Sequence, residues 1–288
     1  MKYILVFIIL LSGLLNAQII VPSSDSSRGA TVGYSVSSSS IVNNPSFLTF
    51  LKDDFLGFGY VRYYNPSFFY SFNIGYGKKL NVDGGAAFLW QRYNSSENVE
   101  FFDYQENQFN IAYGHILFDF LRPGACLKIL NIDTDSGSAM GYGLSLSFLV
   151  IPADNYYLSV ILDRVLSSQL KWSTNLKEEM ERGLFVGVGY KVKLWKIQTI
   201  FSADYMVNNV KINDYVISDD PGYDDIKSGL TFNYGFLDLS IGFIKNDQWN
   251  ITSGLGVSIM ENGKTGINFI NNGNELGYTT GFYFEYAN

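Results

Sequence analysis

The C-terminal segment from Leu276 to Tyr286 alternates between two kinds of side chain, and this pattern restricts the possible folds more than any other feature. Successive side chains of a β-strand point to opposite sides. One side of this strand would be aromatic and apolar, and the other would carry Gly, Thr, Tyr and Glu. This pattern is typical of the closing strand of an outer-membrane barrel, in which the apolar side faces lipid and the polar side faces the lumen.

The same alternation recurs along the chain. Between Phe55 and Tyr286 about fourteen segments read as strands, most of them over the roughly 9 to 11 residues of a membrane strand. An antiparallel sandwich would also alternate, but its outer face is usually rich in Lys, Glu and Thr, whereas the polar face here is mostly Gly, Ser and Asn. We therefore predict an all-β fold, a transmembrane antiparallel β-barrel of about 14 strands that occupies residues 53–288.

The connections between the predicted strands alternate between short and long. Short ones lie near residues 78–81, 121–124, 152–155, 193–195 and 261–264, and long ones near residues 93–107, 131–138, 163–183 and 206–227. Periplasmic turns are short and extracellular loops are long in outer-membrane barrels. An even number of strands would place both ends of the barrel on the side of the short turns. The acidic residues concentrate in the long segments, as expected of a solvated surface.

The N-terminal residues predict export. Lys2 precedes an apolar run from Ile4 to Leu15, and the small residue Ala17 follows. A basic start, a short apolar core and a small residue before the cleavage site define a secretory signal peptide, which we assign to residues 1–17. The run is too short for a helix that spans a membrane, which takes about 20 residues. We therefore expect the protein in the cell outer membrane of a Gram-negative bacterium, with the signal peptide removed.

Composition agrees with this class. Aromatic residues make up 17% of the chain and charged residues 16%, as suits aromatic girdles and lipid-facing strands. The formal net charge of −7 argues against a nucleic-acid partner. Outer-membrane lipid is the partner that the composition predicts.

Residues 18–52 lack the alternation and form a separate N-terminal segment. Asn44-Pro45 predicts a turn that begins a short helix, because Asn is a good cap and Pro is tolerated in a first helical turn. Phe47 and Leu48, with Phe50 and Leu51, would form an apolar stripe on that helix. We expect this segment to lie in the lumen or at its periplasmic end as a plug. The stripe could equally pack against the barrel wall without acting as a gate.

Several short motifs in the chain resemble a known group. They are Ser27 to Tyr34, which begins Ser-Arg-Gly-Ala, Ser39 to Leu48, which contains Asn44-Pro45-Ser46, Gly124 to Lys128, and Leu158 to Trp172. Together they resemble the PorV/PorQ group of outer-membrane proteins, which is itself similar to the long-chain fatty-acid transporter family of 14-stranded barrels. Gly33-Tyr34 stands where the group usually has paired glycines followed by alanine. The resemblance implies that Arg28, Asn44, Pro45, Phe47 and Leu48 belong to the plug or gate.

Two functions follow from this resemblance. Similarity to PorV/PorQ implies a component of, or cargo-holding partner in, type IX-like protein secretion, with secretion-machinery subunits or secreted proteins as partners. Tyr215, Ile217 and Tyr223 in the loop of residues 206–227 would then contact those proteins. Similarity to the fatty-acid transporters implies passive transport of a hydrophobic small molecule. That alternative needs an apolar lumen, whereas the inward faces read as Gly, Ser, Asn and Lys with scattered Phe69, Phe185 and Phe236. A purely structural barrel is a third possibility.

The sequence predicts no enzyme. Its one histidine, His115, shares a strand face with Phe109, Ile111 and Tyr113, and we expect it to face lipid near the interface. Residues 133–137 have the Asp-x-Asp start of a calcium loop but lack the terminal Glu that such a loop requires. We therefore predict no catalytic residue, no metal site and no cofactor.

Overall fold

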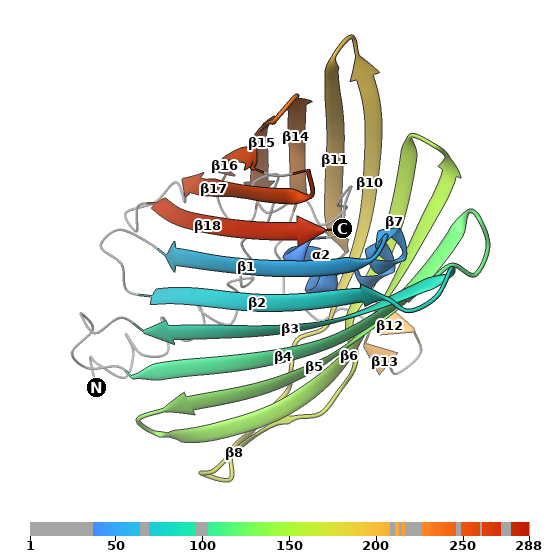
Figure 1. Ribbon diagram of the computed structural model, residues 1–288. Coiled ribbons are helices and arrows are strands. Elements are labelled where there is room, and N and C mark those ends of the chain that lie inside the picture. The colour runs from blue at the N-terminus through green and yellow to red at the C-terminus, as the bar shows by residue number, and fades with distance from the viewer. Residues whose placement is uncertain are drawn as a thin grey trace.

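The computed structural model describes residues 37–63, 69–95, 103–207, 211–212, 215–216, 226–245, 249–259, 261–271 and 278–287. The predicted signal peptide therefore lies outside the described residues, as does Arg28. Within the described part, fourteen strands form one closed antiparallel barrel (Figure 1). Each barrel strand pairs with the next one along the chain, and the last strand pairs with the first. The predicted fold is confirmed.

The barrel strands are β1 (Asp54–Tyr63), β2 (Phe69–Lys79), β3 (Gly84–Ser95), β4 (Tyr104–His115), β5 (Leu121–Thr134), β6 (Gly137–Ala153), β7 (Tyr156–Ser167), β10 (Gly183–Leu194), β11 (Ile197–Val207), β14 (Ile226–Tyr234), β15 (Leu237–Lys245), β16 (Trp249–Ser258), β17 (Gly263–Asn271) and β18 (Tyr278–Ala287). Two short strands, β8 (Leu170–Trp172) and β9 (Lys177–Glu178), extend the edge of β6, and β12 (Lys211–Ile212) pairs with β13 (Tyr215–Val216) apart from the barrel.

The alternation of β18 divides lipid from lumen as predicted. Tyr278 and Phe282 are 42% and 43% exposed on the outer face, while Tyr283 and Glu285 are buried on the inner face. Aromatic and aliphatic side chains are similarly exposed along the outer faces of the other strands. A continuous exposed apolar surface is stable only against lipid. The outer-membrane location follows from this band.

Four of the predicted short turns lie close to their predicted positions, but the turn expected at residues 121–124 is wrong, because β5 begins at Leu121 and the connection from β4 is residues 116–120. One predicted long loop is also wrong. Residues 131–138 form a tight hairpin, because β5 continues to Thr134 and β6 begins at Gly137, its cross-strand partner. Gly137 has a φ of +144°, and the Thr134 hydroxyl donates to its carbonyl oxygen at 2.9 Å. The alternation continues through this segment with polar outward residues, which is why it resembles a loop in sequence.

Strand β7 has an irregular pairing with β6 that the sequence does not predict. Leu144 pairs with Leu166 and Leu146 with Leu162, so three residues of β7 lie opposite Ser145 alone. Arg164, in the middle of the three, has a φ of +50°, a conformation that residues other than glycine rarely adopt. Beyond Asp163, β7 no longer pairs with β10 and continues along β6. The predicted loop of residues 163–183 therefore begins as strand.

Two short helices precede the barrel and lie inside it (Figure 1). They are the α-helix α2 (Ser38–Asn43) and the 3-10 helix η2 (Pro45–Phe50). Both lie at the end of the barrel where the short turns lie, beside the start of β1 and the end of β18. Among the described residues no helix is long and apolar enough to cross a membrane.

Candidate functional site

We use the name plug for the two helices and the residues that flank them, residues 37–51. Ser37 caps α2, because its hydroxyl accepts a hydrogen bond from Ser40 N while the Ser40 side chain bonds back to Ser37. The helix η2 begins at Pro45, as the Asn44-Pro45 step predicts. Asn44 occupies the cap position, but its side chain does not bond the helix backbone; its Oδ1 instead accepts from the Ser46 hydroxyl at 2.5 Å.

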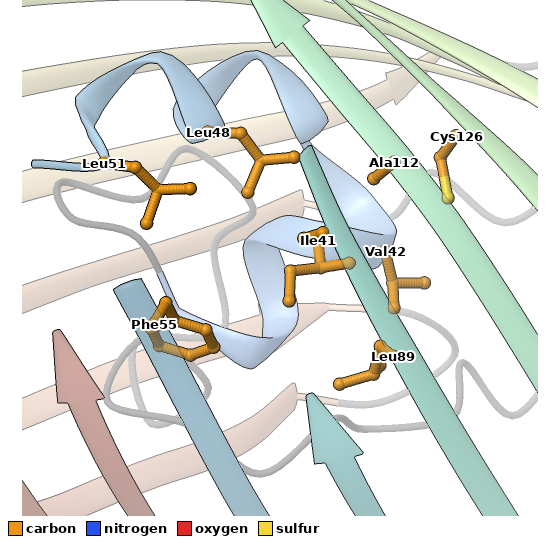
Figure 2. Packing of buried hydrophobic residues seen from close by; sticks show 9 residues of the cluster. Ile41, Val42, Leu48, Leu51, Phe55, Leu89, Ala112 and Cys126 are labelled. Carbon is orange, nitrogen blue, oxygen red and sulfur yellow. The ribbon is translucent and has the colours of Figure 1, made fainter. Parts of the chain in front are cut away.

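Apolar side chains of the plug pack against the inner wall (Figure 2). Four side chains of the plug meet five of the wall in one cluster, formed by Ile41, Val42, Leu48 and Leu51 with Phe55, Ala87, Leu89, Ala112 and Cys126. Phe47 lies in a second cluster with Leu149 and Tyr157. Burying a side chain of this size stabilises a structure by roughly 1.5–3 kcal/mol. The clusters are therefore the main attraction that seats the plug.

A row of small residues on the wall lets the backbone of the plug approach. Gly85, Gly114 and Gly124 are cross-strand partners on β3, β4 and β5, and Ser147 on β6 continues the row. A Cβ atom on Gly114 would lie 2.5 Å from the Pro45 carbonyl oxygen, and one on Gly85 would lie 2.6 Å from that of Leu48. Only glycine leaves room for such contact. We call these four residues the small-residue row.

Polar contacts fix the plug at three further points. Ser38 N donates to Glu285 Oε1 on β18 at 3.0 Å, and Ser46 N donates to the Ser147 hydroxyl on β6 at 3.0 Å. Arg122 of β5 donates to the Thr49 hydroxyl at 3.2 Å, and its guanidinium carbon lies 4.3 Å from the centre of the Phe50 ring. The plug is thus bonded to strands on two sides.

The predicted site residues have different outcomes. Asn44, Pro45, Phe47 and Leu48 come together in the plug and are all buried. Arg28, Ile217 and Tyr223 lie outside the described residues, and only the backbone of Tyr215 is described, in β13. Helix α2 is not among the predicted elements; its signal in the sequence is the run of serines that ends at Ile41 and Val42.

The inner face between the plug and the long loops carries clusters of apolar side chains among buried polar ones. Three clusters of buried side chains line it: Val61, Tyr63, Phe69 and Tyr93; Ile132, Ala139, Leu170 and Met180; and Ile161, Phe185 and Met206. Tyr104 packs against the first two. Phe69 and Phe185 face inward as predicted, whereas Phe236 lies in an exposed turn and not in the lumen. Each strand contributes only one or two of these residues, so the sequence of a single strand does not show an apolar inward face.

A network of charged side chains interrupts this lining at the irregularity of β7. Lys128 Nζ lies 2.5 Å from Asp163 Oδ1, and Arg164 Nε lies 3.2 Å from Asp163 Oδ2. The Ser145 hydroxyl donates to Asp163 at 2.6 Å and accepts from Arg164 N at 3.0 Å. Buried charges require such pairing, because an isolated ion is costly to remove from water. The irregularity therefore places Asp163 where its carboxylate pairs with two cations, Lys128 and Arg164.

The other residues considered from sequence have ordinary surroundings. His115 is half-buried at the end of β4, where its Nδ1 and the Tyr113 hydroxyl are 3.1 Å apart. Cys126 packs in the cluster of the plug. Within the described ranges no group of three or more His, Cys, Asp or Glu side chains could hold a metal ion.

The fold of this chain is similar to those of several solved outer-membrane proteins. The toluene transporter TodX of P. putida superposes with a TM-score of 0.67 at 9% identity, covering 94% of this chain and 99% of that one. The monoaromatic hydrocarbon channel CymD gives 0.72 at 8% identity, with 94% and 98% covered. A FadL homologue of Pseudomonas aeruginosa gives 0.57 at 10% identity, with 92% and 98% covered. No family model matches the chain, and neither does any curated protein.

These likenesses establish the fold alone, an antiparallel outer-membrane barrel that the three structures share with this chain. The secretion role inferred from the PorV/PorQ resemblance is wrong, because the named structures that share the fold over nearly the whole chain are described as transporters and channels for hydrocarbons. The resemblance rested on short motifs of common residues, which the fatty-acid transporter-like barrels can share. The alternative inferred from the sequence, transport of a hydrophobic small molecule, agrees better with these structures.

Proposed function

We propose that the protein is a passive outer-membrane channel for hydrophobic small molecules and not an enzyme. The observation that carries this proposal is the three clusters of buried apolar side chains on the inner face at the loop end, opposite the end that holds the plug. A channel for water-soluble compounds keeps a polar, hydrated lumen. Aromatic and aliphatic side chains instead offer a hydrophobic solute a path that water does not favour.

The plug is the gate in this proposal. It is seated on the small-residue row and in the apolar clusters, so solute that has passed the lumen reaches the periplasm only when residues 37–51 move. Support comes from the structures named above, two of which are described as a toluene transporter and a monoaromatic hydrocarbon channel. Residues 18–52 act as the gating segment, after removal of residues 1–17 by signal cleavage. The relationship to the PorV/PorQ group is proposed on the four short motifs alone, at residues 27–34, 39–48, 124–128 and 158–172.

Uptake by intact cells tests the proposal. Apolar solutes cross simple phospholipid bilayers unaided, so the assay needs a lipopolysaccharide-containing outer membrane as the barrier. Cells of a Gram-negative host that lacks its own hydrocarbon channels would express the protein or an empty vector. The initial uptake of labelled toluene, benzyl alcohol and a hydrophilic disaccharide would be measured at low concentration.

The proposal predicts faster uptake of at least one of the two aromatic compounds and no change for the disaccharide. Equal acceleration of all three would indicate an unspecific pore. No acceleration of either aromatic compound, with the folded protein present in the outer membrane, would refute the channel.

A further inference from the structure

Amide side chains form a row on the inner face of β2, β3 and β4. Asn73 and Gln91 are cross-strand partners, as are Gln91 and Gln108. Partners in such a row have Cβ atoms only about 5 Å apart. Asn73 is fully buried, and Gln91 is 2% exposed. We call Asn73, Gln91 and Gln108 the amide row.

Hydrogen bonding in this region is incomplete. Gln108 Nε2 donates to Asn110 Oδ1 at 2.7 Å, and Asn110 Nδ2 donates to the Leu89 carbonyl oxygen at 3.3 Å. Neither the Nδ2 nor the Oδ1 of Asn73 finds a partner within the described part of the chain, and the same holds for Gln91 Nε2. Buried polar groups in folded proteins almost always have a partner, because leaving them unpaired is costly. The two adjacent amides therefore have unused hydrogen-bonding atoms that suit a group able both to donate and to accept a hydrogen bond.

Apolar side chains lie on both sides of the amide row along the lumen, beside the polar side chains of Ser71, Glu106 and Asn110. Towards the loops lie Phe69 and Tyr93, whose rings stack with centroids 5.3 Å apart, and Tyr63 contacts Tyr93 edge-on at 5.2 Å. Towards the plug lies Leu89, in the cluster of Ile41. A ligand bound here would place a polar atom at the amides and an apolar or aromatic body against these side chains.

The nearby charges disfavour an ionised ligand. Lys128, the cross-strand partner of Asn110, pairs with Asp163 at 2.5 Å, and Arg164 pairs with the same carboxylate at 3.2 Å. Glu106, two residues from Gln108 on the same face, accepts a hydrogen bond from Tyr104 at 2.6 Å. A carboxylate at the amide row would lie near the acidic side chain of Glu106, and both cations of the β7 network already pair with Asp163. An uncharged group pays no such electrostatic penalty.

We propose that the amide row binds the uncharged, hydrogen-bonding head of an otherwise hydrophobic ligand, such as an alcohol or a phenol. This inference rests on the proposed function and narrows it, because it distinguishes such ligands from pure hydrocarbons and from carboxylates. Asn73 accepts from and donates to the head group, Gln91 donates to it, and the aromatic cluster holds the ring. The amides are thus the determinant of specificity within the lumen.

Calorimetric titration of the full-length protein in detergent tests the site with three matched probes: toluene, benzyl alcohol and benzoate. They share one ring and differ only in the head group. We expect benzyl alcohol to bind about tenfold more tightly than toluene, as two hydrogen bonds to buried amides would give. Benzoate should bind most weakly of the three.

Two variants distinguish binding by the amides from binding by the apolar side chains around them. Asn73→Leu and Gln91→Met keep the approximate side-chain size and remove the amide, and each should bring benzyl alcohol to within about threefold of toluene, whose own binding should not fall. Thr231→Val is the matched control, because the buried Thr231 hydroxyl also has no partner among the described residues and lies on β14, away from the amide row. It should leave the preference unchanged. Testing both amide variants keeps the result informative if one of them does not fold.

Two outcomes would overturn the site. An unchanged preference for benzyl alcohol in both folded variants would mean that the amides hold only structural water. Tightest binding of benzoate would mean that the lumen recognises an anion. Failure of the proposed function is distinguishable from failure of the binding site. It would appear as no faster uptake of either aromatic compound by cells, whichever probe the purified protein binds.

Discussion

Replacement of Gly114 by alanine should unseat the plug without damaging the barrel. The added Cβ would lie 2.5 Å from the Pro45 carbonyl oxygen and 3.2 Å from Leu48 Cβ, whereas ordinary contact begins at 3.4 Å. The nearest atoms all belong to the plug, namely those of Pro45, Ser46 and Leu48. The plug must therefore move by close to an ångström, while the strands keep their positions.

The size of the effect follows from overpacking. Forcing an extra carbon into a well-packed contact costs about 1–3 kcal/mol. If the seated plug carries this strain and the released plug does not, the ratio of released to seated molecules rises by roughly 5-fold to 150-fold. Ion conductance through single molecules in a planar bilayer reports this ratio as the fraction of time spent open.

Gly77→Ala is the matched control. It makes the same chemical change on the inner face at the same end of the barrel, but its Cβ would lie 3.3 Å from Ala87 Cβ and 3.5 Å from the nearest plug atom, Leu51 Cδ1. We expect near wild-type conductance for this variant. The reasoning would be refuted if Gly114→Ala stayed closed, or if both variants opened equally.

Three other substitutions test separate contacts. Leu48→Ala should cost about 2–5 kcal/mol of packing and speed amide hydrogen exchange in residues 37–51 but not in the strands; equal acceleration in both would contradict an independent plug. Glu285→Ala removes the acceptor of Ser38 N and should weaken α2 by about 1.5–3 kcal/mol, visible as faster exchange in α2 than in η2, whereas uniform exchange would argue against a local latch. Asp163→Asn leaves Lys128 beside a neutral group, so it should lower the free energy of unfolding, measured by denaturant titration, by about 3–5 kcal/mol. The double variant Asp163→Asn/Lys128→Met should recover part of this loss. If the effects of the two substitutions simply add, the pair is not coupled.

The barrel could be predicted from sequence because its signal is local. Each strand shows a period of two within its own residues, and the inward and outward sides of β18 can be assigned without knowing its neighbours. Asn44-Pro45 likewise predicts the start of η2 from two adjacent residues. These features depend on backbone geometry that every strand or helix start shares.

The interior could not be predicted, because its signals are spread over distant strands. Gly85, Gly114 and Gly124 look in sequence like ordinary strand glycines, and only their register makes them a row. The apolar clusters draw one or two residues from each strand, which led to a polar reading of the lumen. The irregularity at Arg164 depends on the pairing partners of β7, so no local pattern marks it.

The central claim is that solute passes only when the plug moves, and a reversible lock tests it most directly. A Cβ atom on Gly57 would overlap the Ser38 hydroxyl, so cysteines at positions 38 and 57 lie within reach of a disulfide. Cys126 would be replaced by alanine in the same protein to leave one possible bridge.

Uptake of labelled toluene and benzyl alcohol would be compared in cells before and after reduction of the bridge, with each single cysteine variant as control and mass spectrometry to measure bridge formation. When the bridge is formed, we expect cells to take up the solutes no faster than cells with the empty vector. After reduction of the bridge, we expect uptake to return to the rate of the protein that lacks the two introduced cysteines. Undiminished uptake by the fully bridged protein would contradict it.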